Sequence, residues 1–234
     1  MARFPFRYTF LSGAALLVMT PGFAYANVTY SDPFAKQSAG DFGEGTGSLT
    51  VTLPAFNPTT DGVLSGIVIT LATNATASFQ TSNSNPTTSF TFTNGHFSGD
   101  IVVSYTLDGS LSVLNTLAAS GFSGTANAAT PVQLFSAPPL SASNSSSVAA
   151  GNFANYESTA GSQLTFDVSF GGFAAAGTKQ PGAGTALTFG ATGSISGIVT
   201  ITYETVPEPA SMSLIGGGLV GLGVLRRRRN HAAA

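Results

Sequence analysis

The stretch Ile101–Leu107 reads I-V-V-S-Y-T-L, and Asp108-Gly109 follows it at once. Ile101, Val103, Tyr105 and Leu107 alternate with Val102, Ser104 and Thr106. A period of two is typical of a half-buried antiparallel strand, with one face toward a core. Asp-Gly between two alternating runs is a strong hairpin signal. This stretch therefore predicts a β-hairpin that turns at Asp108-Gly109.

The same alternation recurs along the chain, and no segment shows sustained helical periodicity. Further alternating runs lie at residues 48–53, 63–71, 89–93, 163–170 and 194–203. Turn signals separate them at Asn57-Pro58, Asp61-Gly62, Asn94-Gly95, Asp108-Gly109 and Gly171-Gly172. Many short strands with such spacing predict an all-β fold, an antiparallel β-sandwich formed as one domain by residues 27–205. Pro138–Gly151 is a low-complexity stretch and is expected to be a long exposed loop.

The composition limits what this body can do. Charged residues make up 8% of the chain, but hydrophobic residues make up 43% and Phe alone counts 18, so a core can form. There is no Cys, which excludes disulfides and thiolate metal sites. Between Asn27 and Thr205, nine acids face only Lys36 and Lys179, a net charge near −7. Such a surface repels phosphate backbones, so nucleic acid is not an expected partner.

The N-terminus has the three parts of a secretory signal peptide in order. Arg3 and Arg7 supply a positive region, residues 10–19 form a short apolar run, and Ala24-Tyr25-Ala26 places small residues at positions −3 and −1 of a cleavage site. The apolar run is shorter than the roughly 20 residues of a membrane span. We expect a signal helix in residues 1–26, export through the Sec translocon, and cleavage by signal peptidase after Ala26.

The C-terminus has a second transport segment. Val206-Pro207-Glu208-Pro209 is expected to be extended, because proline fixes φ and removes a backbone donor. Residues 211–225 carry no charge, and Arg226, Arg227, Arg228 and Arg229 follow. An arginine cluster after an apolar run is typical of a stop-transfer signal with a cytoplasmic end. Fifteen helical residues reach roughly 22 Å, short of the ~30 Å hydrocarbon core, which predicts a short and marginal transmembrane helix.

This C-terminal segment resembles a PEP-CTERM sorting signal, with Pro207, Glu208 and Pro209 matching the name-giving motif. The resemblance covers residues 206–230. It implies recognition by an exosortase, a membrane transpeptidase that removes the tail and passes the protein to the surface of a Gram-negative cell. It also implies a role in a biofilm or exopolysaccharide matrix. A permanent tail anchor is the alternative.

A phrase in the body is similar to choice-of-anchor E domains. Residues 53–58 read L-P-A-F-N-P, and Gly62-Val63-Leu64 then opens an alternating run. Asn57 stands where Asp is commoner in those domains, and Asp61 is an addition before the glycine. The resemblance implies a surface-anchored β domain and adds no activity.

Candidates for chemistry are few. His96 is the only histidine of the body and no G-x-S-x-G elbow occurs, so a catalytic triad is not expected. Asp100, Asp108, Glu157 and Asp167 are widely spread, and we interpret them as solvated acids, with Asp100 and Asp108 at the two ends of one strand. We therefore predict no enzyme, no catalytic residue, no metal ligand and no cofactor.

Two binding hypotheses stay open beside this. Asp41 and Glu44 in a Gly-rich loop could offer oxygen ligands to calcium. Tyr30, Tyr105, Tyr156 and Tyr203 could bind sugars, although core positions are the favoured interpretation. The sequence thus predicts an exported surface or matrix protein that is held briefly in the inner membrane. Its alternative is a secreted carbohydrate- or calcium-binding module.

Overall fold

The computed structural model describes residues 26–38, 47–171 and 174–206, with single residues at 216, 218 and 219. Ten strands and one short 3-10 helix make up these ranges. They are β1 Ala26–Ser38, β2 Gly47–Pro54, β3 Val63–Asn83, β4 Phe90–Tyr105, β5 Asp108–Ala126, β6 Gln133–Ser136, β7 Leu140–Ser147, η1 Ala150–Tyr156, β8 Gln163–Phe170, β9 Ala174–Lys179 and β10 Leu187–Val206. The predicted signal helix and transmembrane helix lie outside the described residues.

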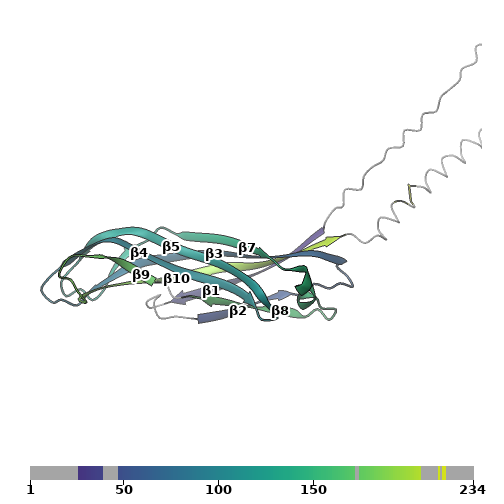
Figure 1. Ribbon diagram of the computed structural model, residues 1–234, viewed down its shortest axis with the longest axis horizontal. Helices are drawn as coiled ribbons and strands as arrows, with labels where there is room; N and C mark the ends of the chain where they lie inside the picture. Colours follow the sequence, from purple (N-terminus) through teal and green to yellow (C-terminus); the bar gives the residue numbers. More distant parts are fainter. Residues whose placement is uncertain (1–25, 39–46, 172–173, 207–215, 217, 220–234) are drawn as a thin grey trace, which may run out of the picture.

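The strands form two antiparallel sheets that pack face to face, which confirms the predicted all-β sandwich (Figure 1). One sheet has the order β1-β10-β3, with β6 and β7 sharing the far side of β3. The other has the order β2-β8-β4-β5, with β9 continuing the column of β8 along β4. The longest strands, β3 and β10, pair along their whole length and run through the middle of the first sheet.

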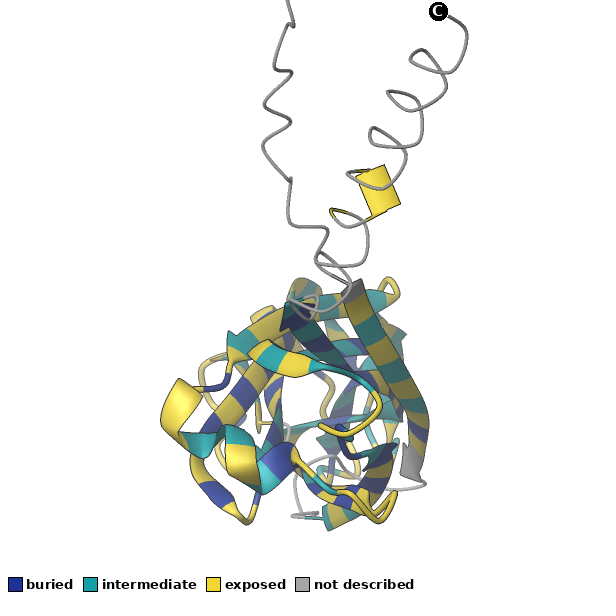
Figure 2. Cartoon of the chain, turned by 90° about the vertical axis from the view of Figure 1, so that its right-hand side faces the viewer, coloured by how far each residue is buried: buried dark blue, intermediate teal, exposed yellow. Residues whose placement is uncertain are grey.

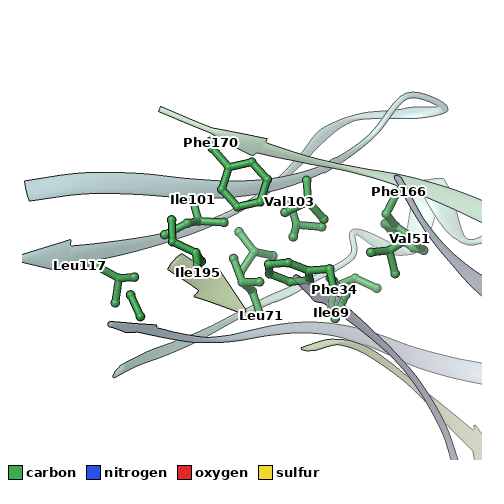
Figure 3. Packing of buried hydrophobic residues seen from close by; sticks show 14 of the residues in the cluster. Phe34, Val51, Ile69, Leu71, Ile101, Val103, Leu117, Phe166, Phe170 and Ile195 are labelled. Carbon is green, nitrogen blue, oxygen red and sulfur yellow. The ribbon is translucent and has the colours of Figure 1, made fainter. Parts of the chain in front are cut away.

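Alternation of side chains explains the two layers. In β3, residues from Ile67 to Asn83 alternate between buried and less buried positions, and β10 does the same from Ile195 to Thr205. Figure 2 shows this banding of buried and exposed residues along the strands of the sandwich. The buried members of both sheets point toward one another and form one continuous core (Figure 3). Removal of this apolar surface from water is the main force that holds the sheets together.

A group of phenylalanine rings packs together at one end of the core. The ring of Phe79, which is fully buried, lies 5.1 to 6.4 Å from the rings of four other phenylalanines: Phe92, Phe122, Phe135 and Phe189. Such centroid distances are those of favourable aromatic pairs. We call this group the phenylalanine cluster.

Side chains also close both lateral edges of the sandwich. On one side, a carboxylate oxygen of Asp32 in β1 accepts the backbone N–H of Thr52 in β2 at 3.0 Å. On the other side, the amide of Asn144 in β7 donates to the carbonyl of Leu114 in β5 at 2.8 Å. Unpaired edge groups invite pairing with other chains, and these bonds occupy part of them.

Three sequence predictions need correction. Pro138–Gly151 is not a long loop, because Leu140–Ser147 forms β7 and pairs with Val68–Ala75 of β3. Leu140 and Ala142 are half-buried at alternate positions, as is Ser146, whereas the other four serines are exposed. Repeated serine suggests low complexity, but a strand at the side of a sheet needs only half of its side chains to be apolar.

The other two corrections concern turns. Asn94-Gly95 does not separate two strands but lies inside β4, where the register shifts and Asn94 takes φ 52°. The predicted hairpin exists, but Thr106-Leu107 forms its two-residue loop and Asp108 already pairs with Tyr105. Leu107, which we expected on the inner face, is therefore 65% exposed.

Candidate processing site at the tail end of the sandwich

Of the predicted processing residues, the structure describes Ala26 and Val206, one at each end of the body. Ala24, the motif residues Pro207, Glu208 and Pro209, and the stop-transfer residues lie outside the described residues. The stop-transfer residues are Arg226, Arg227, Arg228 and Arg229.

The first and last strands lie side by side. β1 and β10 are antiparallel with Ala26 opposite Thr205 and Asn27 opposite Glu204. The start of β1 and the end of β10 therefore lie at the same end of the sandwich (Figure 1). We call this the tail end.

The last residues of β10 are held from both sides. Thr205 is 3% exposed and faces Ala26 in β1, and Val206 pairs with Val63 in β3. The pairing shifts by one residue between Glu204 and Thr205, which leaves Ser65 as the extra residue of a β-bulge. The Ser65 hydroxyl donates to the Glu204 carbonyl at 2.9 Å and so stabilises this irregularity.

The turn Asn57–Gly62 lies against the point where the chain leaves β10. Gly62 has φ +92°, a conformation that L side chains rarely adopt, and a Cβ there would be 3.7 Å from the carbonyl oxygen of Val206. The two Asp61 carboxylate oxygens accept the Asn57 N–H at 3.0 Å and the Thr60 hydroxyl at 2.8 Å. The Asn57 amide oxygen accepts the Thr59 N–H at 3.0 Å. These bonds within the turn fix its shape, as expected of Asn and Asp in turns.

Buried aromatic rings support this turn from below. Tyr203 is fully buried, its hydroxyl donates to the Pro54 carbonyl at 2.9 Å, and its ring centroid lies 5.3 Å from that of Phe56. Phe56 is also fully buried and exchanges backbone hydrogen bonds with Tyr156 and Ser158. Burial, with a smaller contribution from Tyr30, raises the pKa of Tyr203. The L-P-A-F-N-P phrase, residues 53–58, thus leads into the turn Asn57–Gly62. We call this turn, together with Val63, the rim of the tail end.

A buried carboxylate lies in the same half of the molecule. Asp108 is 2% exposed and accepts the hydroxyls of Ser110 at 2.6 Å and Tyr156 at 2.9 Å, and the Asn152 amide at 2.7 Å. Burial alone would raise the pKa of Asp108, but these hydrogen bonds outweigh it and hold the pKa below its ordinary value. Burial raises the pKa of Tyr156, and its bond to Asp108 adds to that rise.

The Asp108 network fastens η1 to the β4–β5 hairpin. Tyr156 and Asn152 both come from η1, and Tyr105 at the end of β4 donates its hydroxyl to the Asn155 carbonyl at 2.9 Å. We predicted Asp108 only as a turn residue and a solvated acid. Its buried role depends on partners more than forty positions away, which no local pattern indicates.

The other acidic residues that we considered as catalytic candidates do not form a cluster. Asp100 lies in β4 and accepts the Thr116 hydroxyl at 2.6 Å, so it is not on the same strand as Asp108. Asp167 lies in β8 and Glu157 is exposed after η1. His96 is exposed, and its Nδ1 lies 2.9 Å from the Asn94 carbonyl at the irregular part of β4. Within the described ranges, no three His, Cys, Asp or Glu side chains come close enough to hold a metal ion.

The structure bears on the hypothesis of sugar binding by tyrosines but not on that of calcium binding. Tyr105, Tyr156 and Tyr203 are buried and Tyr30 is half-buried, so the tyrosines are core residues and not a sugar-stacking surface. Asp41 and Glu44 lie outside the described residues, and calcium binding there stays a prediction. No helix among the described residues has the length and apolar character needed to cross a membrane.

Comparison with known proteins bears on the tail and not on the body. Residues 205–229 match the family model described as the PEP-CTERM protein-sorting motif. No curated protein matches the chain. A solved structure entitled "Structure of infectious bursal disease virus Gx strain" aligns at 11% identity and a TM-score of 0.19. The alignment covers 79% of this chain and 38% of that one, so this chain spans well under half of its length.

The match confirms the sorting signal that the sequence predicted, whereas the resemblance to choice-of-anchor E domains stays a prediction. The matched motif begins at Thr205, inside β10, so the fold and the sorting signal share two residues. A PEP-CTERM motif implies export, transient anchoring in the membrane and processing by an exosortase.

Proposed function

We propose that this chain is a cell-surface protein of a Gram-negative bacterium whose β-sandwich is cargo and whose two ends are transport signals. The signal peptide, residues 1–26, directs export. The C-terminal segment, residues 206–230, holds the protein in the inner membrane with its arginines on the cytoplasmic side until an exosortase removes the tail. The released domain, residues 27–205, then acts without catalysis in the exopolysaccharide or biofilm matrix.

The sorting motif at residues 205–229 carries this proposal. The position of the chain ends is compatible with it, because Ala26 and Thr205 are opposite each other, so both membrane-directed segments join the domain at one end. A structural role for the acids also fits, because Asp100, Asp108 and Asp167 lie on three different strands and each bonds to a hydroxyl group of the fold.

Mass spectrometry of the protein recovered from the cell surface tests the sorting proposal. We expect the mature protein to lack residues 211–234 and to begin at Asn27. Glu208→Ala should retain the tail, because it removes the acid of the motif. Glu157→Ala, which alters an exposed acid outside the motif, should be processed normally. Tail peptides in the wild-type surface protein would instead indicate a permanent anchor.

A second candidate function is binding of a neutral carbohydrate, favoured by the outer face of the β1-β10-β3 sheet. Two adjoining grooves of about 250 and 310 Å³ lie there and share Thr76 and Pro139. No charged residue is among the described residues that line them. Their lining is rich in hydroxyl groups, from Thr76, Ser78, Ser136, Ser141, Thr192, Ser194 and Ser196.

Titration with neutral oligosaccharides tests this candidate, since a ligand that binds only the folded state raises the melting temperature. Ser194→Val should abolish the rise, because Ser194 lines a groove and shares a 2.9 Å hydrogen bond with Thr76. Thr202→Val is the matched control, because Thr202 pairs with Thr29 on the same sheet but lines neither groove. Equal melting temperatures with and without sugar would dismiss the candidate.

A further inference from the structure

We propose that the turn Asn57–Gly62, together with Val63, is the surface of the folded domain that the tail-processing enzyme contacts while it holds the sorting motif. This inference rests on the sorting function proposed above. It assigns a partner to a surface of the body, whereas the motif itself lies in the tail.

The first step concerns the distance between the folded domain and the sorting motif. Val206 is the last residue of β10, and Pro209 is only three residues beyond it. A fully extended chain covers at most about 3.6 Å per residue, so Pro209 lies within about 11 Å of Val206. A protein interface of ordinary size covers roughly 800 Å² on each partner, which is a disc of about 16 Å radius. An enzyme that grips Pro207–Pro209 therefore covers part of the tail end as well.

The second step is which part it covers. Gly62 is the residue whose added Cβ would lie 3.7 Å from the Val206 carbonyl, the group that forms the peptide bond to Pro207. Val63 follows and pairs with Val206. Val63 is nevertheless 58% exposed, a large apolar side chain on the rim. The turn and Val63 thus lie directly beside the bond at which the sorting motif leaves the fold.

The third step is that neither strand nor turn can easily move aside. Thr205 is buried between β1 and β3, and the Tyr203 hydroxyl holds Pro54 at the base of the turn. Peeling β10 would expose the fully buried Tyr203 ring to water, which is unfavourable for so large an apolar surface. Binding to the rigid rim as it stands therefore costs the enzyme less free energy than opening it.

The chemistry of the rim suits a protein partner. Both carboxylate oxygens of Asp61 are satisfied inside the turn by Asn57 and Thr60. Pro58, Thr59 and Thr60 are exposed and uncharged. Together with Val63 they present a small, mostly neutral and rigid surface, which loses little conformational entropy on binding. The same residues continue the L-P-A-F-N-P phrase, so the proposal gives that phrase a role beside the tail.

Site-specific blocking tests the contact, and the lack of native cysteine makes the labelling unambiguous. Val63→Cys places a thiol on the rim. Val132→Cys makes the same change just before β6, where the side chain is 46% exposed and the paired residues of β3 lie far along that strand from Val63. Both full-length precursors, purified from cells without the sorting enzyme, are labelled after folding with a bulky polyethylene-glycol maleimide. They are then mixed with membranes that contain the enzyme, and tail loss is followed by mass.

We expect the labelled Val63→Cys precursor to be converted at least about tenfold more slowly than the labelled Val132→Cys precursor, which corresponds to loss of roughly 1.4 kcal/mol of docking. The unlabelled Val132→Cys precursor should be converted as wild type, and circular dichroism should show all precursors folded. A Gly-Ser linker of about ten residues between Val206 and Pro207 adds roughly 17 Å of mean reach. With this linker the enzyme can hold the motif without touching the turn, so the labelled Val63→Cys and Val132→Cys precursors should be converted at equal rates. The unlabelled wild type with the linker should be converted more slowly than without it, because it loses the contact.

Equal rates for the two labelled precursors without the linker would overturn the proposed contact, and so would a difference between them that persists with the linker. Failure of the unlabelled wild-type precursor to lose its tail is a different result. It would show that the sorting function itself is wrong, and the contact with it.

Discussion

The hydroxyl of Tyr156 donates to Asp108 at 2.9 Å, and both residues are almost completely shielded from solvent. This bond joins η1 to the first residue of β5. A buried carboxylate is costly unless each oxygen accepts hydrogen bonds, and the Ser110, Asn152 and Tyr156 side chains satisfy this one. The network is therefore a place where small changes have measurable effects.

Tyr156→Phe should lower the free energy of unfolding by about 1–3 kcal/mol, because it leaves a buried charged acceptor without one donor. Urea denaturation measures the change. Thr116→Val removes a hydroxyl from the exposed Asp100 and should cost far less. Similar losses for the two variants would mean that Asp108 gains no special stabilisation from burial.

Acid should weaken the same network. The pKa of Asp108 is lower in the folded state than in the unfolded chain, so its contribution is complete above the unfolded pKa of about 3.9. It is lost as the pH falls from there through the folded pKa. Asp108→Asn should be less stable than wild type at pH 7, and the difference should shrink toward pH 2. Melting curves across this range check the trend, and a constant difference would contradict it.

Gly197→Ala should destabilise the fold by about 1–3 kcal/mol, the usual cost of overpacking a core. A Cβ at this position would overlap the Phe34 ring and lie 2.6 Å from the Ala72 carbonyl oxygen, which belongs to the backbone and cannot swing away. Gly109→Ala is the matched control, since no atom lies within 4 Å of its added Cβ. Thermal melting that ranks the two variants equally would refute the close packing of β1 on β10.

Asn115→Ala should cost about 2–3 kcal/mol, because the buried Asn115 amide donates to the Leu71 and Ala142 carbonyls across the lateral edge. Asn144→Ala, which loses a single exposed bond to Leu114, should cost less than about 1 kcal/mol. Chemical denaturation distinguishes them. The reverse order would show that edge closure depends on Asn144.

A cysteine pair can test whether the first and last strands meet. Thr29 and Thr202 are register partners whose hydroxyl oxygens lie 3.3 Å apart, so Thr29→Cys with Thr202→Cys should form a disulfide on air oxidation. Closing so large a loop should raise stability by about 2–4 kcal/mol. Thr29→Cys with Ser196→Cys, well off register, should remain reduced. Mass after alkylation reads the outcome, and disulfide formation in both pairs would argue against a fixed register.

Sequence periodicity indicated β2, β3, β4, β8 and β10, but neither the strands β1, β6, β7 and β9 nor the partner of any strand. Alternation at residues 63–71 and 163–170 predicted β3 and β8, and the turn at Asn57–Gly62 was also expected. Pairing order depends on contacts between distant segments, so nothing local indicates that β10 lies between β1 and β3. The serine-rich strand β7 was missed for the same reason. It forms because it pairs with β3, and its own composition gives no sign of that pairing.

The C-terminal sorting signal could be read from the sequence because it is a local pattern of charge and apolar residues, whereas the N-terminal signal peptide stays a prediction. The pairing of Ala26 with Thr205 could not be read in this way, because the two residues lie far apart in the sequence. Asp108 shows the same limit at a single residue. Its Asp-Gly context predicted a turn, while Asn152 and Tyr156 give it a buried role.

The order β1-β10-β3 also affects the timing of folding. β1 pairs within the first sheet only with β10, and β3 needs β10 on one side, so that sheet lacks its middle until residue 206 is present. In a chain that crosses a membrane N-terminus first, the earliest strand to arrive must wait for the latest. A chain exported in this direction cannot complete the first sheet until β10 has crossed, so the sandwich closes only when export is nearly finished.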